Sequence, residues 1–261
     1  MPGTRPFEIV AHRGVPTEAP ENTIPSFEQA IERGADAVEM DVRLTRDRVP
    51  VVYHYFYLDE VTTASGPIFD YTLAQLRDVK LLGHDGHPLR DSRIPTLREV
   101  LEAIGGRIGL EIEVKGPEPE SAGAIGTVLQ DFRPLWETME VTSYEPALLL
   151  ALQRHCPGLT MDLLLPRAEE WMGPDVITYL AIHRGRLARA RAVHLHSPLL
   201  SREVVSEIRA WGIEVHAFDV NDERSLRRAV ELEVPRICTD ALQQALDFCR
   251  RMRDDKPCPT L

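Results

Sequence analysis

The sequence has few cysteines, few aromatic residues and no long apolar run. Its four cysteines lack C-x-x-C spacing, which argues against a zinc knuckle and a redox pair. They are Cys156, Cys238, Cys249 and Cys258. No apolar run approaches the ~18 residues that a membrane-spanning helix needs, so we expect no integral membrane association. The first residues also lack the charged and apolar regions of a secretory signal, and the expected location is the cytoplasm, with reduced thiols.

Positive charge is also in short supply. The chain has 30 Lys and Arg against 41 Asp and Glu, a formal net charge of −11. This balance argues against a nucleic-acid partner, because nucleic-acid-binding proteins usually need a basic face. Hydrophobic residues make up 43% of the chain, enough to bury a sizeable core and to exclude wholesale disorder. The 261 residues suit two small domains or one barrel-sized α/β domain, and the composition gives no indication of the oligomeric state.

What the chain does contain is a repeated pattern of a short β-type apolar run, a turn and an amphipathic helix. The predicted strands cover 7–11, 37–42, 109–114, 139–142, 159–164, 192–195, 214–218 and 236–238. The predicted helices cover 26–33, 95–104, 146–155, 176–190, 201–211, 223–231 and 241–253. Gly34 suits a left-handed helix C-cap, and Ser201 and Asn221 lie where helix N-caps belong.

Eight strand–helix units in about 250 residues predict an α/β fold, a single TIM (β/α)8 barrel domain spanning residues 1–261. A doubly wound open sheet is the alternative, but no G-x-G-x-x-G motif follows the first predicted strand. The alternation is interrupted at 43–93, a segment with a second extended run at 49–54 and one short helix near 73–82. So long a stretch between a strand and its helix is typical of a functional insertion, which we expect after the second strand, over the barrel mouth.

Acidic side chains cluster at the ends of predicted strands, where TIM barrels hold their active sites. Alternation along a strand puts Glu39 and Asp41 on one face, and Glu113 on the same face as Lys115. Carboxylates gathered in one barrel mouth repel each other unless a cation holds them. An all-oxygen ligand set favours one divalent Mg²⁺, Ca²⁺ or Mn²⁺ ion over zinc. The alternative is that Glu39 and Asp41 form buried ion pairs with Arg13 or Lys115.

Two histidines extend this candidate site. His12 follows the first predicted strand, and His54 ends the extended run that comes after a hairpin turn. If Asp47-Arg48 is a two-residue loop, Asp41 lies directly opposite His54 in the hairpin. Histidines that flank a metal from different segments meet the requirement for a general acid and a general base on opposite sides of a phosphorus or carbonyl centre.

These residues belong to an ordered set of short motifs that runs along nearly the whole chain. The set comprises His12-Arg13-Gly14, Pro20-Glu21-Asn22-Thr23, Gly34-Ala35-Asp36, Glu39-x-Asp41-Val42, Thr45-x-Asp47, His54, Ile94-Pro95-Thr96-Leu97, Glu113-x-Lys115, Thr142-Ser143-Tyr144 and Thr239-Asp240. In this order the motifs resemble the glycerophosphodiester phosphodiesterase family. Each motif alone is weakly specific, whereas the ordered set is highly specific. The resemblance implies a TIM barrel with an insertion after the second strand.

The resemblance also implies a mechanism. Glu39, Asp41 and Glu113 would bind one divalent cation, and His12 and His54 would be the catalytic acid/base pair. A glycerol hydroxyl, deprotonated by one histidine, would attack phosphorus and expel the alcohol, which the other histidine protonates. Water would then open the cyclic phosphate to give glycerol 3-phosphate.

Substrate contacts follow from the same resemblance, with two departures from the family pattern. Arg13 and Lys115 would contact the phosphate of the small-molecule diester. Phe218 would contact substrate at a place where the family tends to have a Trp. The chain reads His54-Tyr55 where the family usually has His-Asp. If that Asp orients the histidine or positions the substrate, its loss lowers the rate or changes the headgroup accepted.

Two other functions stay open. Tyr53, Tyr55, Phe56 and Tyr57 form an aromatic cluster that either packs the insertion onto the barrel rim or walls a site for a bulkier alcohol. The second case would give a lysophospholipase D-like or cyclising phosphodiesterase with an altered headgroup. The missing Asp after His54 favours a third function, a non-catalytic barrel that binds phosphorylated ligands.

The later part of the chain holds further charged and imidazole groups. Arginines at 184, 186, 189 and 191 are interpreted as a solvated helix face. His194 and His196 share one face of a predicted strand, and His196 is the one expected to reach the mouth.

Overall fold

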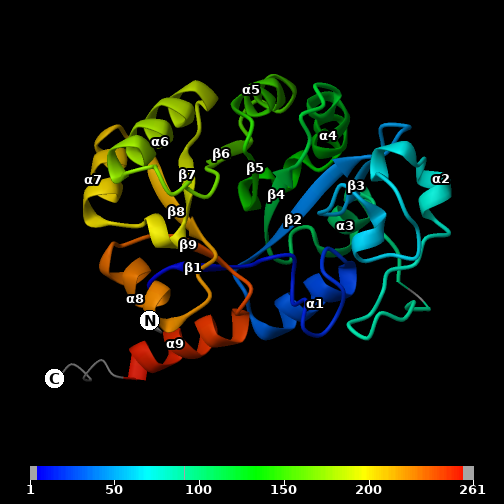
Figure 1. Ribbon diagram of the computed structural model, residues 1–261, viewed down its shortest axis with the longest axis horizontal. Coiled ribbons are helices and arrows are strands. Elements are labelled where there is room, and N and C mark those ends of the chain that lie inside the picture. Colours follow the sequence, from blue (N-terminus) through cyan, green and yellow to red (C-terminus); the bar gives the residue numbers. More distant parts are fainter. Residues whose placement is uncertain (1–4, 91, 255–261) are drawn as a thin grey trace.

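The computed structural model describes residues 5–90 and 92–254 and shows a closed barrel of eight parallel strands (Figure 1). The order around the barrel is β1-β9-β8-β7-β6-β5-β4-β2, and β2 pairs with β1 to close it. The strands are β1 Glu8–Ala11, β2 Ala37–Leu44, β4 Gly109–Val114, β5 Met139–Ser143, β6 Thr160–Leu164, β7 Ala192–His196, β8 Glu214–Phe218 and β9 Arg236–Thr239. The predicted TIM barrel is therefore confirmed.

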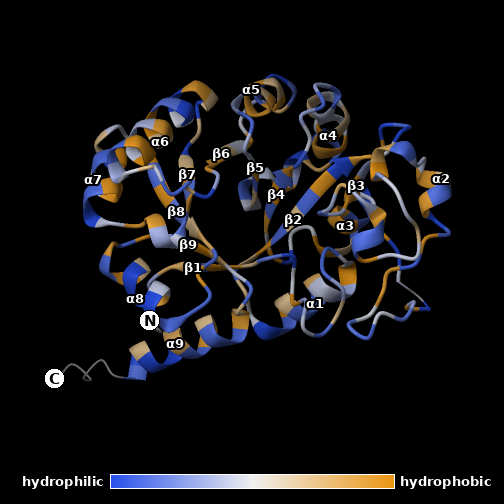
Figure 2. Ribbon diagram, in the orientation of Figure 1, coloured by the Kyte–Doolittle hydropathy of each residue, from blue (hydrophilic) through white to orange (hydrophobic). Residues whose placement is uncertain are grey.

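Helices follow the strands and pack around the outside of the barrel (Figure 1). They are α1 Ile24–Arg33, α3 Leu97–Ile104, α4 Glu120–Asp131, α5 Pro146–His155, α6 Pro174–Ala188, α7 Arg202–Ala210, α8 Glu223–Glu231 and α9 Leu242–Asp254. Figure 2 shows them striped in hydrophilic and hydrophobic colours, the pattern of helices with one face on a core. Within residues 5–90 and 92–254, no helix is long and apolar enough to cross a membrane.

The helix caps agree with two of the three sequence expectations. Gly34 ends α1 in the left-handed region, at φ 82°, and the Ser201 side chain accepts a hydrogen bond from the Val204 N–H at the start of α7. The N-cap of α8 is Asp222, not Asn221 as predicted. Because Asp222 forms a capping box with Ser225, the Asn221 side chain is left for another role at the barrel mouth.

Two helices differ from the sequence prediction. Helix α4 was not predicted, because its glycines (Gly123, Gly126) and small residues give a weak apolar stripe. In the segment 73–82 the helix is only α2, Leu73–Leu76, whose capping box between Thr72 and Gln75 fixes its start.

The hairpin after β2 has a different register from the predicted one. Strand β3, Pro50–Val52, pairs antiparallel with β2, and Val42 lies opposite Val52. The Tyr53 N–H donates to the Asp41 carbonyl at 2.8 Å, so the residue facing Asp41 is Tyr53, not His54. The prediction assumed a two-residue loop. The loop has three residues, and its last, Arg48, adopts φ 61°.

The segment between β3 and α3 builds a second hydrophobic cluster beside the main core. Its buried members are Val51, Tyr53, Leu58, Ile68, Leu76, Val79, Leu81 and Ile94. The barrel strands and the helices around them, from β1 to α9, bury the main core between them. The aromatic cluster is thus divided: Tyr53 is buried in the second core, whereas Phe56 and Tyr57 are 49% and 56% exposed.

The arginine series is only partly the solvated helix face that the sequence suggested, since Arg186 and Arg189 are exposed but Arg184 and Arg191 contact other elements. Arg191 donates to Asp162 and Glu140 inside the barrel, and Arg184 donates to the Tyr144 carbonyl at 2.6 Å.

The described cysteines are buried free thiols: Cys156, Cys238 and Cys249. Burial raises the pKa of each of these thiols. Cys258 lies outside the described residues.

Candidate active site

Three carboxylates meet at the C-terminal ends of β2 and β4. Glu39, Asp41 and Glu113 each offer an oxygen, and these oxygens lie within 4.8 Å of one another. The parallel register places Asp41 directly beside Glu113, and the two-residue period of β2 turns Glu39 to the same face. The three residues are between 0% and 6% exposed.

The carboxylate trio fits a divalent cation. Glu39 Oε1 is buried and has no hydrogen-bond partner, whereas the buried Asp41 Oδ1 and Glu113 Oε1 contact Lys115 Nζ. Burial, together with the charge of Asp41, raises the pKa of Glu39 well above its usual range. Burial also raises the pKa of Glu113, to about 7. The oxygens of the three carboxylates form an all-oxygen donor set, which is the set that Mg²⁺, Ca²⁺ and Mn²⁺ prefer.

Two basic side chains border the trio. Arg13 Nε lies 3.1 Å from Asp41, and Lys115 Nζ lies 3.0 Å from Asp41 and 2.8 Å from Glu113. Burial disfavours the Asp41 carboxylate, but Lys115 and Arg13 hold its pKa well below the usual range. The ion pairs considered from the sequence therefore form at Asp41. Glu39 instead accepts the backbone N–H of Arg13 at 3.2 Å.

His12 is held by a hydrogen-bonded chain of loop residues. Its Nδ1 lies 2.6 Å from Asp240, and Asp240 accepts a hydrogen bond from the Asn221 amide at 2.9 Å. The opposite ring nitrogen, Nε2, lies 3.8 Å from Glu39. Burial by itself lowers the pKa of His12, but the Asp240 hydrogen bond and the charge of Glu39 raise it to about 9. The surroundings of His12 therefore favour its protonated form at neutral pH.

His54 has the opposite electrostatic environment. Burial lowers the pKa of its imidazole to about 3, and the nearby Asp41 carboxylate only partly opposes this shift. The ring meets Tyr55 edge-on at 4.7 Å between centroids, and its buried Nδ1 has no hydrogen-bond partner. The His54 carbonyl accepts a 2.7 Å hydrogen bond from Arg43 Nε, which fixes the backbone. The surroundings of His54 therefore favour its neutral form at neutral pH.

Sequence reasoning assigned no role in the site to Asn22, Asp240 or Asn221. Asn22 makes two hydrogen bonds with Asp41: its amide donates to the carboxylate at 2.8 Å, and its Oδ1 accepts the backbone N–H at 3.0 Å. The signal was present, since Asn22 and Asp240 both lie in the motifs that carry the family resemblance. Loop side chains have no periodicity from which their direction can be predicted.

The remaining predicted residue, Phe218, lies at the end of β8. It borders a small cavity of about 40 Å³ together with His12, Glu39, Glu113 and Asp240. Its ring stacks on His196 at 5.5 Å. Phe218 therefore lies at the barrel mouth beside the candidate site.

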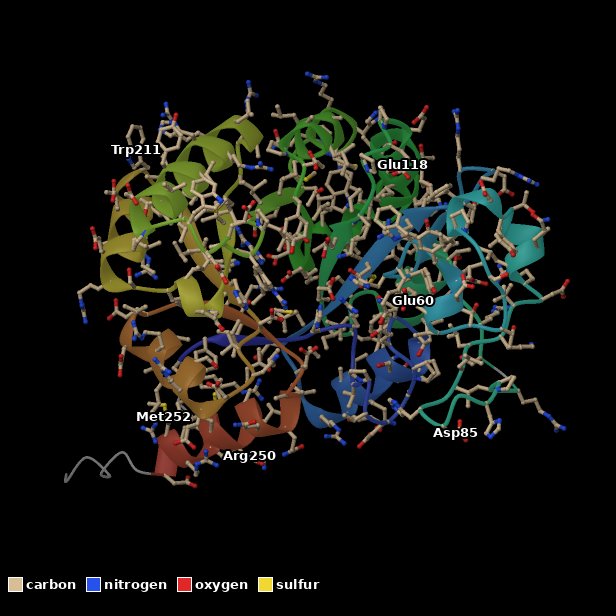
Figure 3. The ribbon with its side chains drawn as sticks, viewed as in Figure 1. Glu60, Asp85, Glu118, Trp211, Arg250 and Met252 are labelled. Atoms are coloured by element: carbon tan, nitrogen blue, oxygen red, sulfur yellow. The ribbon has the colours of Figure 1, made fainter. Side chains whose placement is uncertain are left out.

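Two larger cavities adjoin the site and share His54. One, of about 580 Å³, is bordered by Lys115, Glu113 and aromatic side chains. The other, of about 700 Å³, lies between the loop after β1 and the segment that follows β3. Glu60, labelled in Figure 3, borders both. His54 is thus accessible from two directions.

A TIM barrel that gathers buried carboxylates, histidines and basic side chains at its mouth has the architecture of an enzyme. The sequence comparisons then specify which enzyme family. Residues 12–244 match the Glycerophosphoryl diester phosphodiesterase family, so the chain belongs to this family and the predicted resemblance is confirmed.

Individual relatives cover nearly the whole chain. YhdW of Bacillus subtilis is 31% identical over 89% of this chain and 93% of its own length. The glycerophosphodiester phosphodiesterase of Caldanaerobacter subterraneus subsp. tengcongensis is 27% identical over 93% and 98%. The solved structure of an Oleispira antarctica phosphodiesterase, in complex with the product sn-glycerol-3-phosphate, matches with a TM-score of 0.79. It is 26% identical and covers 93% of this chain and 96% of that chain.

Proposed function

We propose that this protein hydrolyses glycerophosphodiesters to glycerol 3-phosphate and an alcohol, with one divalent cation held by Glu39, Asp41 and Glu113. The observation that carries the proposal is the pairing of a cationic His12 with a neutral His54 beside these carboxylates. Two titratable groups whose environments push their pKa values apart are typical of an acid/base pair. Membership of the family supports the same reaction.

The protonation states assign the two roles. His54, neutral and with an unpaired buried nitrogen, accepts the proton of the glycerol hydroxyl as that oxygen attacks phosphorus. His12, protonated and oriented by Asp240, donates a proton to the departing alcohol. Water then opens the cyclic phosphate, with the histidines in exchanged roles, to give glycerol 3-phosphate.

Positively charged side chains would stabilise the negative charge of the phosphate. Arg13 and Lys115 border the carboxylates, where they would contact the non-bridging oxygens. A bound divalent cation would supply further stabilisation of the charge that develops on those oxygens. Phe218 would close the opposite side of the substrate.

The cavity of about 580 Å³ that Lys115 borders suggests which class of alcohol departs. Its walls combine the aromatic rings of Tyr55, Phe56 and Tyr144 with the carboxylates of Glu60 and Glu145. Aromatic faces and carboxylates together favour a cationic group, so we propose choline or ethanolamine as the departing alcohol. We also propose that residues 1–261 act as one domain, with the segment 43–93 covering the mouth.

A second candidate function rests on the exposure of the same aromatic wall. Phe56 and Tyr57 present half of their surfaces to solvent beside the cavity. An acyl chain would cover these rings, so the corresponding activity is that of a lysophospholipase D.

The decisive experiment measures glycerol phosphate released from glycerophosphocholine and glycerophosphoethanolamine in Mg²⁺, Ca²⁺ and Mn²⁺, with a chelator arm. We expect metal-dependent release that His12→Ala and His54→Ala each lower by about 10²–10⁴-fold. His155→Ala, on the exposed end of α5, is the matched control and should behave as the wild type.

Other outcomes of this assay distinguish the alternatives. Activity on lysophospholipids without release of glycerol phosphate from either diester would replace glycerophosphodiester hydrolysis with a lysophospholipase D activity. Binding of phosphodiesters without turnover, unchanged in both histidine variants, would leave a non-catalytic binding barrel.

A further inference from the structure

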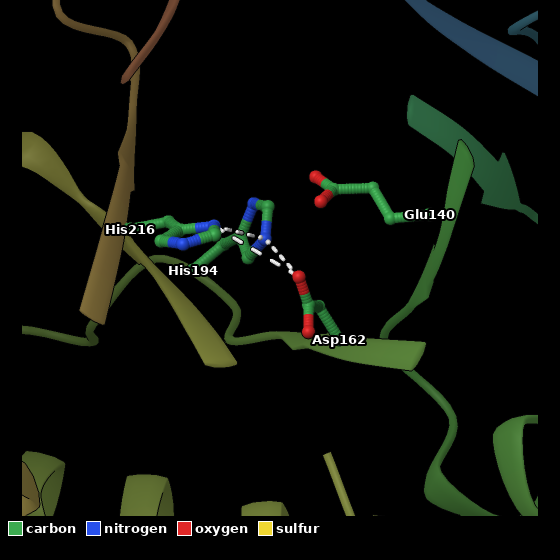
Figure 4. Close-up of side chains that lie close together, drawn as sticks. All are labelled: Glu140, Asp162, His194 and His216. Carbon is green, nitrogen blue, oxygen red and sulfur yellow. Dashed lines mark hydrogen bonds and ion pairs between the residues drawn. The ribbon is translucent and has the colours of Figure 1, made fainter. Parts of the chain in front are cut away.

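A second cluster of ionisable side chains lies deeper in the barrel. Glu140, Asp162, His194 and His216 project inward from four neighbouring strands, β5 to β8 (Figure 4). All four are at most 4% exposed, and atoms of the four converge within 4.8 Å. We propose that this floor cluster is a structural zinc site, separate from the carboxylates of the mouth.

The separation from the mouth follows from position along the strands. Glu111 lies two residues before Glu113 on β4 and therefore faces the same side of the strand, one layer deeper. Glu111 Oε1 is 3.4 Å from His194 Nδ1, so it borders the floor cluster.

Three ligand atoms already have the spacing of a zinc coordination face. His194 Nε2 is 3.1 Å from His216 Nδ1 and 3.4 Å from Asp162 Oδ2, and the third edge, from His216 Nδ1 to Asp162 Oδ2, is 3.9 Å. Tetrahedral zinc with bonds of about 2.0–2.2 Å separates its ligand atoms by roughly 3.3–3.6 Å. A single ion can therefore reach all three atoms with little movement of the side chains.

Glu140 supplies the fourth ligand. Figure 4 shows its carboxylate extending from β5 toward His194 and Asp162. Its Oε2 accepts a hydrogen bond from Arg191 at 2.6 Å, whereas the buried Oε1 has no hydrogen-bond partner and lies 3.0 Å from Arg236 Nε. Each Glu140 oxygen thus contacts one arginine, and Oε1 would exchange its contact with Arg236 for the ion.

Each imidazole also has a carboxylate behind it. The outer nitrogen of His194 faces Glu111 at 3.4 Å, and the outer nitrogen of His216 faces Glu214 at 3.5 Å. This is the usual arrangement around metal-bound histidines, because the outer carboxylate accepts the N–H, fixes the tautomer and leaves the inner lone pair for the metal.

The charges around the cluster call for a cation. The guanidinium groups of Arg191 and Arg236 are in ion-pair contact with the acids of the cluster or with acids that adjoin it. The buried acids among them are Glu111, Glu140 and Asp162. Three buried carboxylates against two guanidinium groups leave one negative charge, which a proton on the histidine pair or a bound cation can balance. Two imidazoles with carboxylates select zinc, unlike the all-oxygen mouth.

The first test is the metal content of the full chain. Protein produced with added zinc and passed over a chelating resin should retain about one zinc per chain, as a closed structural site does. His194→Gln and His216→Gln should each lose this zinc. His196→Gln, two residues further along β7, and Asp41→Asn at the mouth should keep it. Loss of the zinc in Asp41→Asn but not in His216→Gln would overturn the proposal.

A second measurement on the wild type covers the case in which the histidine variants fail to fold. X-ray absorption at the zinc edge should show two imidazoles and two oxygens at about 2.0–2.2 Å. A folded wild type that binds no zinc would overturn the proposal. So would imidazole ¹⁵N NMR signals from His194 carrying protons on both nitrogens in protein prepared with zinc, because a shared proton would then occupy the place assigned to the ion.

Discussion

His12 and His54 show how one barrel mouth gives the same side chain two protonation states. His12 is part-buried against two carboxylates, and the hydrogen bond that its Nδ1 donates to Asp240 favours the protonated ring. His54 lies where burial outweighs the single opposing charge of Asp41. The two surroundings therefore favour opposite protonation states of the same residue type at neutral pH.

Asp240→Asn tests how the His12 proton is held. The hydrogen bond raises the pKa of His12, so its removal lowers that pKa. A general acid works only while protonated, and the alkaline limb of the pH profile should therefore move to lower pH. At neutral pH we expect kcat to fall about 10–100-fold with little change in KM. The measurement is kcat/KM against pH, with Asp247→Asn on the exposed face of α9 as the control. An unmoved alkaline limb would contradict the assignment.

Metal binding at the mouth should release protons. Burial raises the pKa of Glu39 and that of Glu113, the latter to about 7, so protons bind these carboxyls more readily as the pH falls. A cation must displace them, so apparent affinity for Mg²⁺ or Mn²⁺ should fall as pH decreases. Calorimetry in buffers of different ionisation enthalpy measures the protons released. Equal heats in all buffers would refute this prediction, and Glu113→Gln should release fewer protons than the wild type.

The candidate metal ligands could be predicted from the sequence, but the residues that hydrogen-bond to the site side chains could not. Alternation along two strands is enough to bring Glu39, Asp41 and Glu113 together, because parallel strands end at the same rim. Asp240 and Asn22 lie in loops distant in sequence from the groups they contact. Only chain closure brings them close, and no local pattern encodes that.

The β2–β3 hairpin was placed one residue out of register because its loop length was misjudged. Arg48 takes a left-handed conformation, φ 61°, which a side chain with a Cβ rarely adopts. The low propensity of arginine for a positive φ argues against this conformation, but the buried pairing of Val42 with Val52 fixes the register that requires it.

Arg48→Gly should therefore stabilise the protein. Glycine removes the steric cost of the left-handed conformation, and after its greater entropy loss we expect a net gain of about 0.5–1 kcal/mol. Arg48 is exposed and its contact with Glu120 is long, at 3.7 Å, so little is lost with the side chain. Urea unfolding measures the change. Arg46→Gly, in the same loop without a positive φ, should not stabilise.

Gly14 sets the path of the loop that carries His12 and Arg13. Its φ is 90°, and a Cβ there would overlap Ser26 Oγ and lie 2.7 Å from the Ser26 backbone. The Ser26 hydroxyl is fixed in turn by hydrogen bonds with Val15 and Arg13. The loop can therefore neither move aside nor accept a side chain.

Gly14→Ala should lower the free energy of unfolding by about 2–3 kcal/mol and reduce activity in the fraction that stays folded. Thermal unfolding and activity are measured on the same sample. Gly86→Ala is the control, since it shares the positive φ, at 76°, but has open space around its Cβ. Equal losses in both variants would show that strain in φ, rather than the contact with Ser26, is responsible.

Barrel closure joins two layers of charge that the sequence shows only as separate strand residues. The mouth layer holds Glu39, Asp41 and Glu113, and the floor layer holds Asp162 and the groups around it. The strand–helix alternation predicted the closed barrel, since eight such units close in only one common way. The side chains that meet inside depend on strand tilt and stagger, which are properties of the closed sheet as a whole.

The net charge of −11 should make catalysis depend on salt in a substrate-specific way. A field of this sign repels a net anionic diester such as glycerophosphoglycerol, whereas zwitterionic glycerophosphocholine carries no net charge. Added salt shortens the Debye length from ~30 Å at 0.01 M to ~10 Å at 0.1 M, and screens the distant acids more than the close contacts of Arg13 and Lys115.

Raising NaCl over this range should therefore increase kcat/KM for glycerophosphoglycerol by a few-fold and leave that for glycerophosphocholine nearly unchanged. Initial rates at constant free Mg²⁺ measure both. A fall for the anionic diester would mean that Arg13, Arg43 and Lys115 dominate the potential at the mouth. In that case Glu18→Gln and Glu21→Gln should make kcat/KM fall more steeply with salt, because both residues border the cavity between the β1 loop and the segment after β3. If the overall charge governs binding of the anionic diester instead, the same substitutions should raise kcat/KM at low salt and reduce its increase with salt.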